Sequence, residues 1–214
     1  MEPETQKCEA ILQAWYPGQQ GGKAVAEVLF GDYNPAGKLP VTFYRNVSQL
    51  PDFEDYNMTG RTYRYMQDVP LFPFGYGLSY TTFGYGKTVL DKNELTAGQS
   101  LKLTVPVTNT GKRNGEEVVQ VYLRKQGDAE GPIKTLRAFK RVSIPAGKTV
   151  NVEFDLKDKE LEWWDDQSNT VRVCPGNYDI MVGGSSKEED LQRTTIAIKS
   201  VSYTHLRAHE TLAN

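Results

Sequence analysis

The sequence predicts a mainly β fold, in which an antiparallel β-sandwich follows a remnant of an α/β sandwich domain. Three observations predict this class. Apolar and polar residues alternate with a period of two after residue 86, and turn-forming Gly, Pro and Asn residues separate the alternating runs. A helical period occurs only within the first 50 residues. One helix with one or two strands cannot cover both faces of a parallel sheet, so the α/β part is incomplete.

Residues 1–50 are predicted to be the C-terminal end of that α/β domain. The apolar run at 10–15 indicates a strand, which ends at the turn residues Tyr16-Pro17-Gly18. A helix should follow and stop at Gly31, and residues 37–44 should be extended. The missing sheet would leave apolar surface exposed and favour self-association through Ile11, Leu12, Trp15, Val28 and Leu29.

Residues 51–86 are predicted to be an aromatic-rich connecting segment packed between two bodies. A solvated linker would not carry so many rings, because burying each ring instead would stabilise the fold by roughly 2 kcal/mol. A sugar-stacking platform is the alternative interpretation. The rings are Tyr63, Tyr65, Phe72, Phe74, Tyr76, Tyr80, Phe83 and Tyr85.

Residues 87–201 are predicted to form the sandwich, with about seven strands. Pro106 lacks a backbone N–H, so its strand should be an edge strand or bulged at that point. The alternating runs lie around Leu101–Val107, Val119–Leu123, Val150–Leu156, Tyr178–Val182 and Ile196–Ile198.

Composition excludes several classes of function. The 214 residues carry 25 basic and 27 acidic side chains, which gives no basic footprint for nucleic acid. No apolar run approaches the roughly 20 residues of a membrane span, and the acidic start Met1-Glu2-Pro3-Glu4 does not resemble a signal peptide. With two cysteines and two histidines, all far apart or near the C-terminus, no metal or cofactor site is expected.

Two groups of carboxylates could in principle carry acid–base chemistry. They are Asp52, Glu54 and Asp55 in a polar loop, and Asp165 and Asp166 beside two tryptophans. Neighbours on a strand point to opposite faces, so Asp165 and Asp166 should not converge, and we expect solvated turn acids. The glycine-rich stretch 18–22 lacks the lysine–serine ending of a phosphate loop and should be a tight turn.

Several motifs resemble the family-3 glycoside hydrolases, a family of β-glucosidases and β-xylosidases. They come in that family's order and spacing, and later stretches resemble the fibronectin type III-like domain with which many members end. The first set is Ala14-Trp15-Tyr16-Pro17-Gly18-Gln19, Leu29-Phe30-Gly31-Asp32-Tyr33-Asn34-Pro35-Ala36-Gly37-Lys38-Leu39-Pro40, Arg61-Thr62-Tyr63-Arg64-Tyr65 and Phe74-Gly75-Tyr76-Gly77-Leu78-Ser79-Tyr80-Thr81. The second set is Leu136-Arg137-Ala138-Phe139-Lys140-Arg141-Val142, Leu161-Glu162-Trp163-Trp164 and Pro175-Gly176-Asn177-Tyr178.

The resemblance implies a retaining, exo-acting β-glycosidase that is secreted or periplasmic and acts on oligosaccharides with two carboxylates. In that family both carboxylates lie upstream of the Trp-Tyr-Pro-Gly motif, which begins here at Trp15. No catalytic residue can therefore be assigned to this chain, and we expect a structural module. The alternatives are an interaction module and a carbohydrate-binding module with Tyr122, Trp163 and Trp164 as stacking rings.

Residues 202–214 are predicted to be a non-native tail, because the alternation stops after Ile198. His205 and His209 stand four residues apart in it, a spacing that helical metal sites use, but no third ligand is near in the sequence. Cys8 and Cys174 fall in different predicted parts of the chain, so both thiols are expected to stay free.

Overall fold

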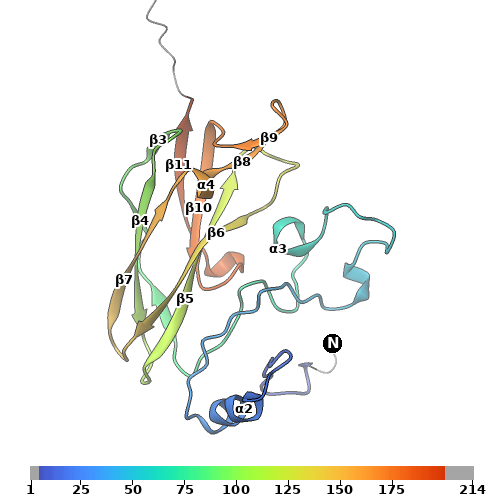
Figure 1. The fold of residues 1–214 in the computed structure, drawn as a ribbon, viewed down its shortest axis with the longest axis vertical. Helices are drawn as coiled ribbons and strands as arrows, with labels where there is room; N and C mark the ends of the chain where they lie inside the picture. Colours follow the sequence, from blue (N-terminus) through green and yellow to red (C-terminus); the bar gives the residue numbers. More distant parts are fainter. Residues whose placement is uncertain (1–4, 201–214) are drawn as a thin grey trace, which may run out of the picture.

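The computed structural model describes residues 5–200, and the mainly β fold class is confirmed. In Figure 1 the strands form an elongated sandwich, and the chain before β1 lies along one side of it. The predicted tail and its two histidines fall outside the described residues. The helical segments are α2 (Gly21–Phe30), η1 (Val47–Gln49), α3 (Thr62–Tyr65), α4 (Asp158–Leu161) and η2 (Glu188–Asp190).

Two sheets make up the sandwich. In the first, β4 (Leu101–Asn109) pairs with β7 (Thr149–Leu156) on one side and with both β1 (Phe83–Tyr85) and β2 (Val89–Leu90) on the other. The second has the order β3 (Glu94–Thr96), β11 (Gln192–Lys199), β10 (Gly176–Gly183), β5 (Gly115–Lys125) and β6 (Thr135–Ile144). These pairings are antiparallel apart from the parallel pair of β3 and β11. A small hairpin is formed by β8 (Trp163–Asp165) and β9 (Thr170–Arg172).

The predicted alternation marks the residues that fill the space between the sheets. On β4 every second residue from Leu101 to Asn109 is buried. On β7 the same holds for Val152, Phe154 and Leu156. Each buried side chain of this kind stabilises the fold by about 1.5–3 kcal/mol relative to an exposed one.

The position of Pro106 differs from the prediction. Its strand β4 is paired on both sides and is not an edge strand. Pro106 lies between the residues that pair with β1 and those that pair with β2. There the backbone N–H of Gly86 donates to the Pro106 carbonyl oxygen at 2.7 Å, so the missing N–H of proline falls where the neighbouring strand is interrupted.

The α/β part contains the predicted helix but not the predicted strand at 10–15. Helix α2 ends at Gly31, whose φ of +80° and N–H bond to the Val28 carbonyl form a left-handed cap. Residues 10–15 form no strand, because no described strand runs beside them to complete a ladder. The extended stretch at 37–44 instead pairs with the connecting segment, through a bridge between Phe43 and Phe72 and through backbone hydrogen bonds of Leu39 with Gly75 and Tyr76.

Candidate functional site

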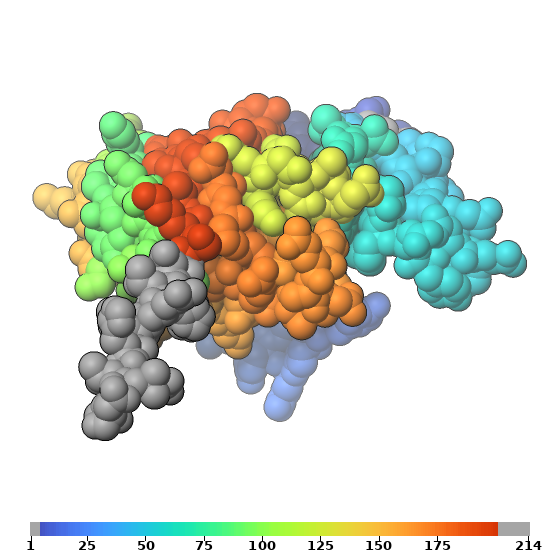
Figure 2. Space-filling model, turned by 90° about the horizontal axis from the view of Figure 1, so that it is seen from above, coloured from blue at the N-terminus to red at the C-terminus, as the bar shows by residue number. Residues whose placement is uncertain are grey.

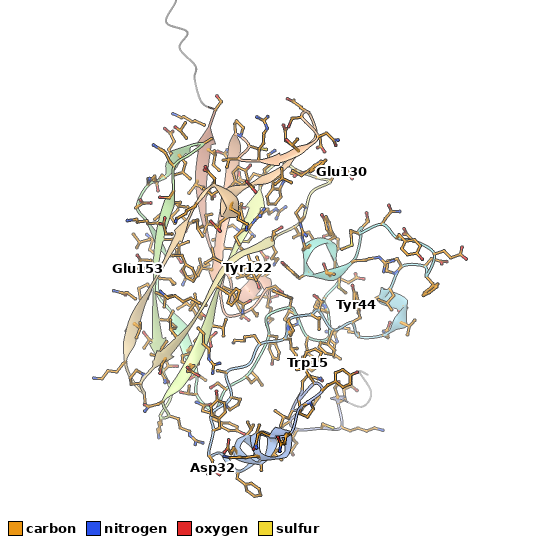
Figure 3. All side chains as sticks on the ribbon, viewed as in Figure 1. Trp15, Asp32, Tyr44, Tyr122, Glu130 and Glu153 are labelled. Atoms are coloured by element: carbon orange, nitrogen blue, oxygen red, sulfur yellow. The ribbon has the colours of Figure 1, made fainter. Side chains whose placement is uncertain are left out.

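The aromatic connecting segment packs against the sandwich through its rings. Tyr63 stacks on Phe74 with ring centroids 4.3 Å apart, and its edge meets Tyr122 of β5 at 5.8 Å. Phe72 stacks on Tyr76 at 5.7 Å. Figure 3 marks Tyr122 on the sandwich and Tyr44 on the neighbouring part of the chain. These four stacked rings therefore pack as the sequence predicted for this segment, whereas Tyr80, in the same predicted set, is 45% exposed.

Gln120 fixes the connecting segment to the sandwich. Its Nε2 donates to the carbonyl oxygens of Gly75 at 3.2 Å and Gly184 at 2.6 Å, and its Oε1 accepts from the Tyr122 hydroxyl at 2.5 Å. A Cβ on Gly75 would lie 2.1 Å from that Oε1, and Gly75 has a φ of +78°. Only glycine fits here without a shift of the buried amide.

A polar hollow of about 480 Å³ opens at the same junction, and we call it the junction hollow. Lys38 and Glu117 meet in it at 3.1 Å, with side chains only 15% and 6% exposed. The Lys38 ammonium also donates to the Gly77 carbonyl oxygen at 3.1 Å, and the Tyr85 hydroxyl donates to Glu117 at 3.1 Å. Strand β5 supplies Glu117, and the α/β part supplies Lys38, so this ion pair joins the two parts of the chain.

Burial controls the charges in the junction hollow. Burial raises the pKa of Glu117, although the charge of Lys38 and the hydrogen bonds from Lys38 and Tyr85 oppose that rise. The pKa of Tyr85 is also raised, first by burial and then by the charge of Glu117. A carboxyl with a raised pKa is typical of a general acid. The oxygens of Glu117 are, however, already bound by Lys38 and Tyr85, which indicates that this ion pair holds the two parts of the chain together.

Sequence reasoning missed Glu117, and one signal could have found it. Glu117 is in phase with Val119 and Val121 on β5, so it occupies a position that points inward. A charged residue at an inward position needs a partner of opposite charge. That partner, Lys38, is 79 residues away in the sequence, and no local pattern identifies it.

The carboxylates singled out from the sequence hold local turns. Asp52 accepts from the N–H of Glu54 at 3.0 Å, and Asp55 accepts from the N–H of Asn57 at 2.9 Å. Asp165 accepts from the Arg172 guanidinium at 2.7 Å, while Asp166 accepts from the indole of the tryptophan before Asp165. Hydrogen bonds from Asn57 lower the pKa of Asp55, and a hydrogen bond from Ser168 lowers the pKa of Asp165, opposite to what a catalytic acid needs.

The three rings named as possible sugar platforms differ in exposure. Tyr122 is fully buried and Trp163 is 2% exposed, so neither can stack on a sugar. Trp163 instead donates from its indole to Asp128 at 2.5 Å. Only Trp164 of this set, at 48% exposure, presents a face to solvent.

The glycine-rich stretch at 18–22 forms the predicted turn. In the glycine-rich turn the N–H of Gly21 donates to the Gly18 carbonyl oxygen at 2.9 Å, and a Cβ on Gly21 would lie 2.3 Å from Pro17.

Between residues 5 and 200, His, Cys, Asp and Glu side chains form no group of three or more that could hold a metal ion. None of the helices in this part of the chain has the length and hydropathy of a membrane span.

Both cysteines are free thiols in the structure, with Cys8 exposed and Cys174 buried. Burial raises the pKa of Cys174, which slows its reaction because the thiolate is the reactive form. We expect one thiol to react quickly with a thiol reagent in the folded protein and both to react after unfolding. Titration without reductant that finds fewer than two thiols in the unfolded monomer would contradict this expectation.

Comparison with known proteins places the chain in a family. Residues 1–80 match the Glycosyl hydrolase family 3 C-terminal domain, and residues 117–186 match the Fibronectin type III-like domain. A xylan 1,4-beta-xylosidase of Xylanibacter ruminicola is 55% identical over 198 residues, which are 92% of this chain and 23% of that protein. A periplasmic beta-glucosidase of Salmonella typhimurium is 38% identical, over 86% of this chain and 26% of that protein.

Solved structures agree with the sequence comparison. A β-glucosidase structure from Erythrobacter marinus aligns with a TM-score of 0.78 and 42% identity, over 91% of this chain and 26% of that one. The chain thus spans about a quarter of the length of the relatives it matches, in their C-terminal portion. The chain belongs to glycoside hydrolase family 3, of which it carries C-terminal domain sequence and the fibronectin type III-like domain.

Proposed function

We propose that this chain is a non-catalytic C-terminal module of a retaining, exo-acting β-glycosidase that releases terminal β-linked xylose or glucose from oligosaccharides. Its role is to fix the end of the α/β sandwich domain onto a rigid β-sandwich. The observation that carries this proposal is the junction, where Lys38 and Glu117 form a buried ion pair and Gln120 binds the backbone of the connecting segment. The substrate class follows from relatives named as β-xylosidase and β-glucosidase.

The proposal divides the chain into the parts expected from the sequence. Residues 1–50 are assigned to the α/β sandwich domain, 51–86 to the connecting segment and 87–201 to the fibronectin type III-like sandwich. The end of the connecting segment already contributes to the sandwich, because β1 pairs with β4. The exposed apolar side chains of the first part support the first assignment, because a further layer of the α/β domain would cover them. They are Ile11, Leu12, Trp15, Leu29 and Phe30, whereas Val28, which was also expected to be exposed, is half-buried. On its own the chain should self-associate through this surface.

The location of the whole enzyme is part of the same proposal. The relative from Salmonella typhimurium is named a periplasmic enzyme, which supports a secreted or periplasmic glycosidase.

The purified chain is expected to hydrolyse neither nitrophenyl β-xyloside nor nitrophenyl β-glucoside. A retaining glycosidase needs two carboxyl groups about 5–5.5 Å apart, one of them with a raised pKa. Asp55 and Asp165 have lowered pKa values, and the oxygens of Glu117 are bound by Lys38 and Tyr85. The rate of nitrophenol release should be the same with the protein as in buffer without it.

Three variants control that assay for contaminating enzyme. They are Asp52→Asn, Asp165→Asn and Glu117→Gln, each of which removes one carboxylate without changing side-chain size. Turnover that co-purifies with the chain and disappears in any one of them would refute a non-catalytic role.

A carbohydrate-binding module is the second candidate, and the exposed face of Trp164 favours it. Its indole N–H is bound to Asp166 at 2.8 Å, so only the ring face remains available. Titration with xylo- and cello-oligosaccharides separates the two functions. A scaffold gives no heat and no change in tryptophan fluorescence, whereas a binding module gives both, and loses both in Trp164→Ala.

A further inference from the structure

The junction hollow has the size of a site for a small ligand. Its volume of about 480 Å³ lies within the roughly 300–1,000 Å³ that small-molecule sites occupy in proteins. The stretches of chain that line it are far apart in the sequence and include Lys38, parts of 76–85, Glu117 and parts of 184–192. The N–H of Ser186 donates to the Phe74 carbonyl oxygen at 2.9 Å, and Figure 1 shows the turn after β10 beside the connecting segment. Two of the walls are therefore held together before a ligand binds.

The charges that line the hollow are mostly neutralised within the protein. Lys38 pairs with Glu117, and the Tyr85 hydroxyl donates to the same carboxylate. At the rim Glu189 pairs with Lys187 at 3.5 Å. Two of the three lining carboxylates thus have a lysine partner, and one of those lysines lies inside the hollow. This arrangement favours a neutral ligand over an ion.

Ser185 lines the hollow with a buried hydroxyl that is incompletely bonded. The residue is 4% exposed, and its Oγ accepts from the N–H of Lys187 at 3.2 Å. Among residues 5–200 the one acceptor within reach of its proton is the Asp190 carboxylate, which at 3.5 Å is at the outer limit of a hydrogen bond. Buried hydroxyls in native proteins are nearly always paired, so Ser185 can donate a stronger bond to a ligand oxygen.

Two further polar groups of the lining are free to bind a ligand. The ring of Tyr76 stacks on Phe72, while its hydroxyl bonds to no other residue in the described part of the chain. The Asp190 carboxylate forms no ion pair between residues 5 and 200 and accepts only the long bond from Ser185. A hydroxyl both donates and accepts, and a carboxylate accepts. The lining therefore offers both kinds of hydrogen bond.

The hollow also has apolar walls. Leu78 and Phe83 line it from the end of the connecting segment, and Leu191 lines it from the turn before β11. Small-molecule sites combine apolar side chains with a few polar groups that fix the orientation of the ligand. A sugar ring suits this combination, because it has C–H groups on its faces and hydroxyl groups around its edge that both donate and accept.

We propose that the junction hollow binds one pyranose residue. The hydroxyls of Tyr76 and Ser185 donate to its oxygens, and the Asp190 carboxylate accepts from its hydroxyl groups. Leu78 and Phe83 contact its C–H groups. A sugar bound in this way links the connecting segment to the turn after β10 and stabilises the junction. The choice of xylose and glucose as the sugars to test rests on the proposed function, since the relatives are named β-xylosidase and β-glucosidase.

The test measures the binding of D-xylose and D-glucose to the purified chain by calorimetric titration and by thermal unfolding. At a sugar concentration ten times the dissociation constant, the melting temperature should rise by about 3–6 °C more than in the same concentration of xylitol or sorbitol. These acyclic polyols control for the general stabilisation that osmolytes give.

Three variants each remove one polar group from the lining. Asp190→Asn should weaken sugar binding at least tenfold, because it removes a charged acceptor. Tyr76→Phe and Ser185→Ala each remove a neutral hydroxyl and should weaken binding about threefold to tenfold. Trp164 lies outside the hollow, so Trp164→Ala should bind as tightly as the wild type. If one lining variant does not fold, the other two and the titration of the wild type still decide.

Three results would overturn the proposal. The first is the absence of binding to the wild type, and the second is a rise in melting temperature that xylitol or sorbitol matches. The third is an affinity that the lining variants leave unchanged. If Trp164→Ala then abolishes binding, the sugar lies on the hairpin of β8 and β9 and not in the hollow.

This test and the test of the proposed function can fail separately. Among residues 5–200 no tryptophan lines the hollow, so binding there gives heat without a change in tryptophan fluorescence. A scaffold without a sugar site gives neither signal, and binding at the face of Trp164 gives both. A negative titration leaves the non-catalytic role unchanged, whereas hydrolysis of nitrophenyl glycosides would refute that role and not sugar binding in the hollow.

Discussion

Replacing Lys38 by methionine is expected to lower the free energy of unfolding by about 3 kcal/mol at pH 7, which corresponds to a fall of about 6–12 °C in melting temperature. The substitution leaves the Glu117 carboxylate buried, 6% exposed, without its cation. Methionine keeps most of the apolar stem of lysine, so the loss reports the charge and not the packing. Urea unfolding of both proteins measures the difference.

The effect of Lys38→Met should depend on pH. The pKa of Glu117 is raised above 4.5 in the folded protein, so the protonated carboxyl favours folding. Its contribution is complete below pH 4.5 and is lost as the pH rises through the folded pKa. Removing the lysine enlarges that loss, so the variant should differ little from wild type at pH 4 and strongly at pH 7.

Two comparisons control this prediction. Lys23→Met removes a lysine that is 71% exposed in an i,i+4 pair with Glu27, and should change stability by less than about 0.5 kcal/mol. Adding Glu117→Gln to Lys38→Met should restore most of the stability, because the uncompensated charge is gone. A loss that is the same at pH 4 and pH 7 would show that the ion pair does not hold the junction.

Replacing Gly75 by alanine is expected to cost about 2–4 kcal/mol. The new Cβ would lie 2.1 Å from the Oε1 atom of Gln120, and the φ of +78° is strained for any residue with a Cβ. Gln120 cannot move aside freely, because its amide binds two carbonyl oxygens and the Tyr122 hydroxyl. Thermal unfolding measures the loss.

Gly60 offers a matched control for Gly75→Ala. It has a φ of +72°, but a Cβ there would meet nothing within 4 Å. Gly60→Ala should therefore cost only the backbone strain, roughly 1–2 kcal/mol. Equal losses for the two variants would mean that the contact with Gln120 contributes nothing.

The sequence predicted the sandwich because its signal is local. Inward and outward residues alternate along β4 and β7, and the burial of Leu101 through Asn109 follows that alternation. The same reasoning failed at residues 10–15, where the apolar run has no described strand beside it. An apolar run shows that a residue needs a partner surface and does not say whether that surface belongs to a sheet.

The candidate site was harder to predict because its contacts are remote in sequence. Lys38 and Glu117 are 79 residues apart, and Gln120 reaches Gly75 across 45. Each of these residues is unremarkable within its own segment. Local reasoning was correct for Asp55, whose partner Asn57 is two residues away in the same turn. It was wrong for Asp165, which lies at the end of β8 with its side chain 12% exposed and pairs with Arg172 of the neighbouring strand β9.

The central claim is that the sandwich holds the family-3 segment before it as one folded body. Native-state hydrogen exchange followed by mass spectrometry tests this most directly, because it reports the opening free energy of each segment. We expect the backbone amides of Leu39, Phe43 and Gly75, all hydrogen-bonded to backbone carbonyls, to exchange only with the same global unfolding that exposes β5. Rapid exchange at 39–43 and 71–76 while β5 remains protected would contradict the claim.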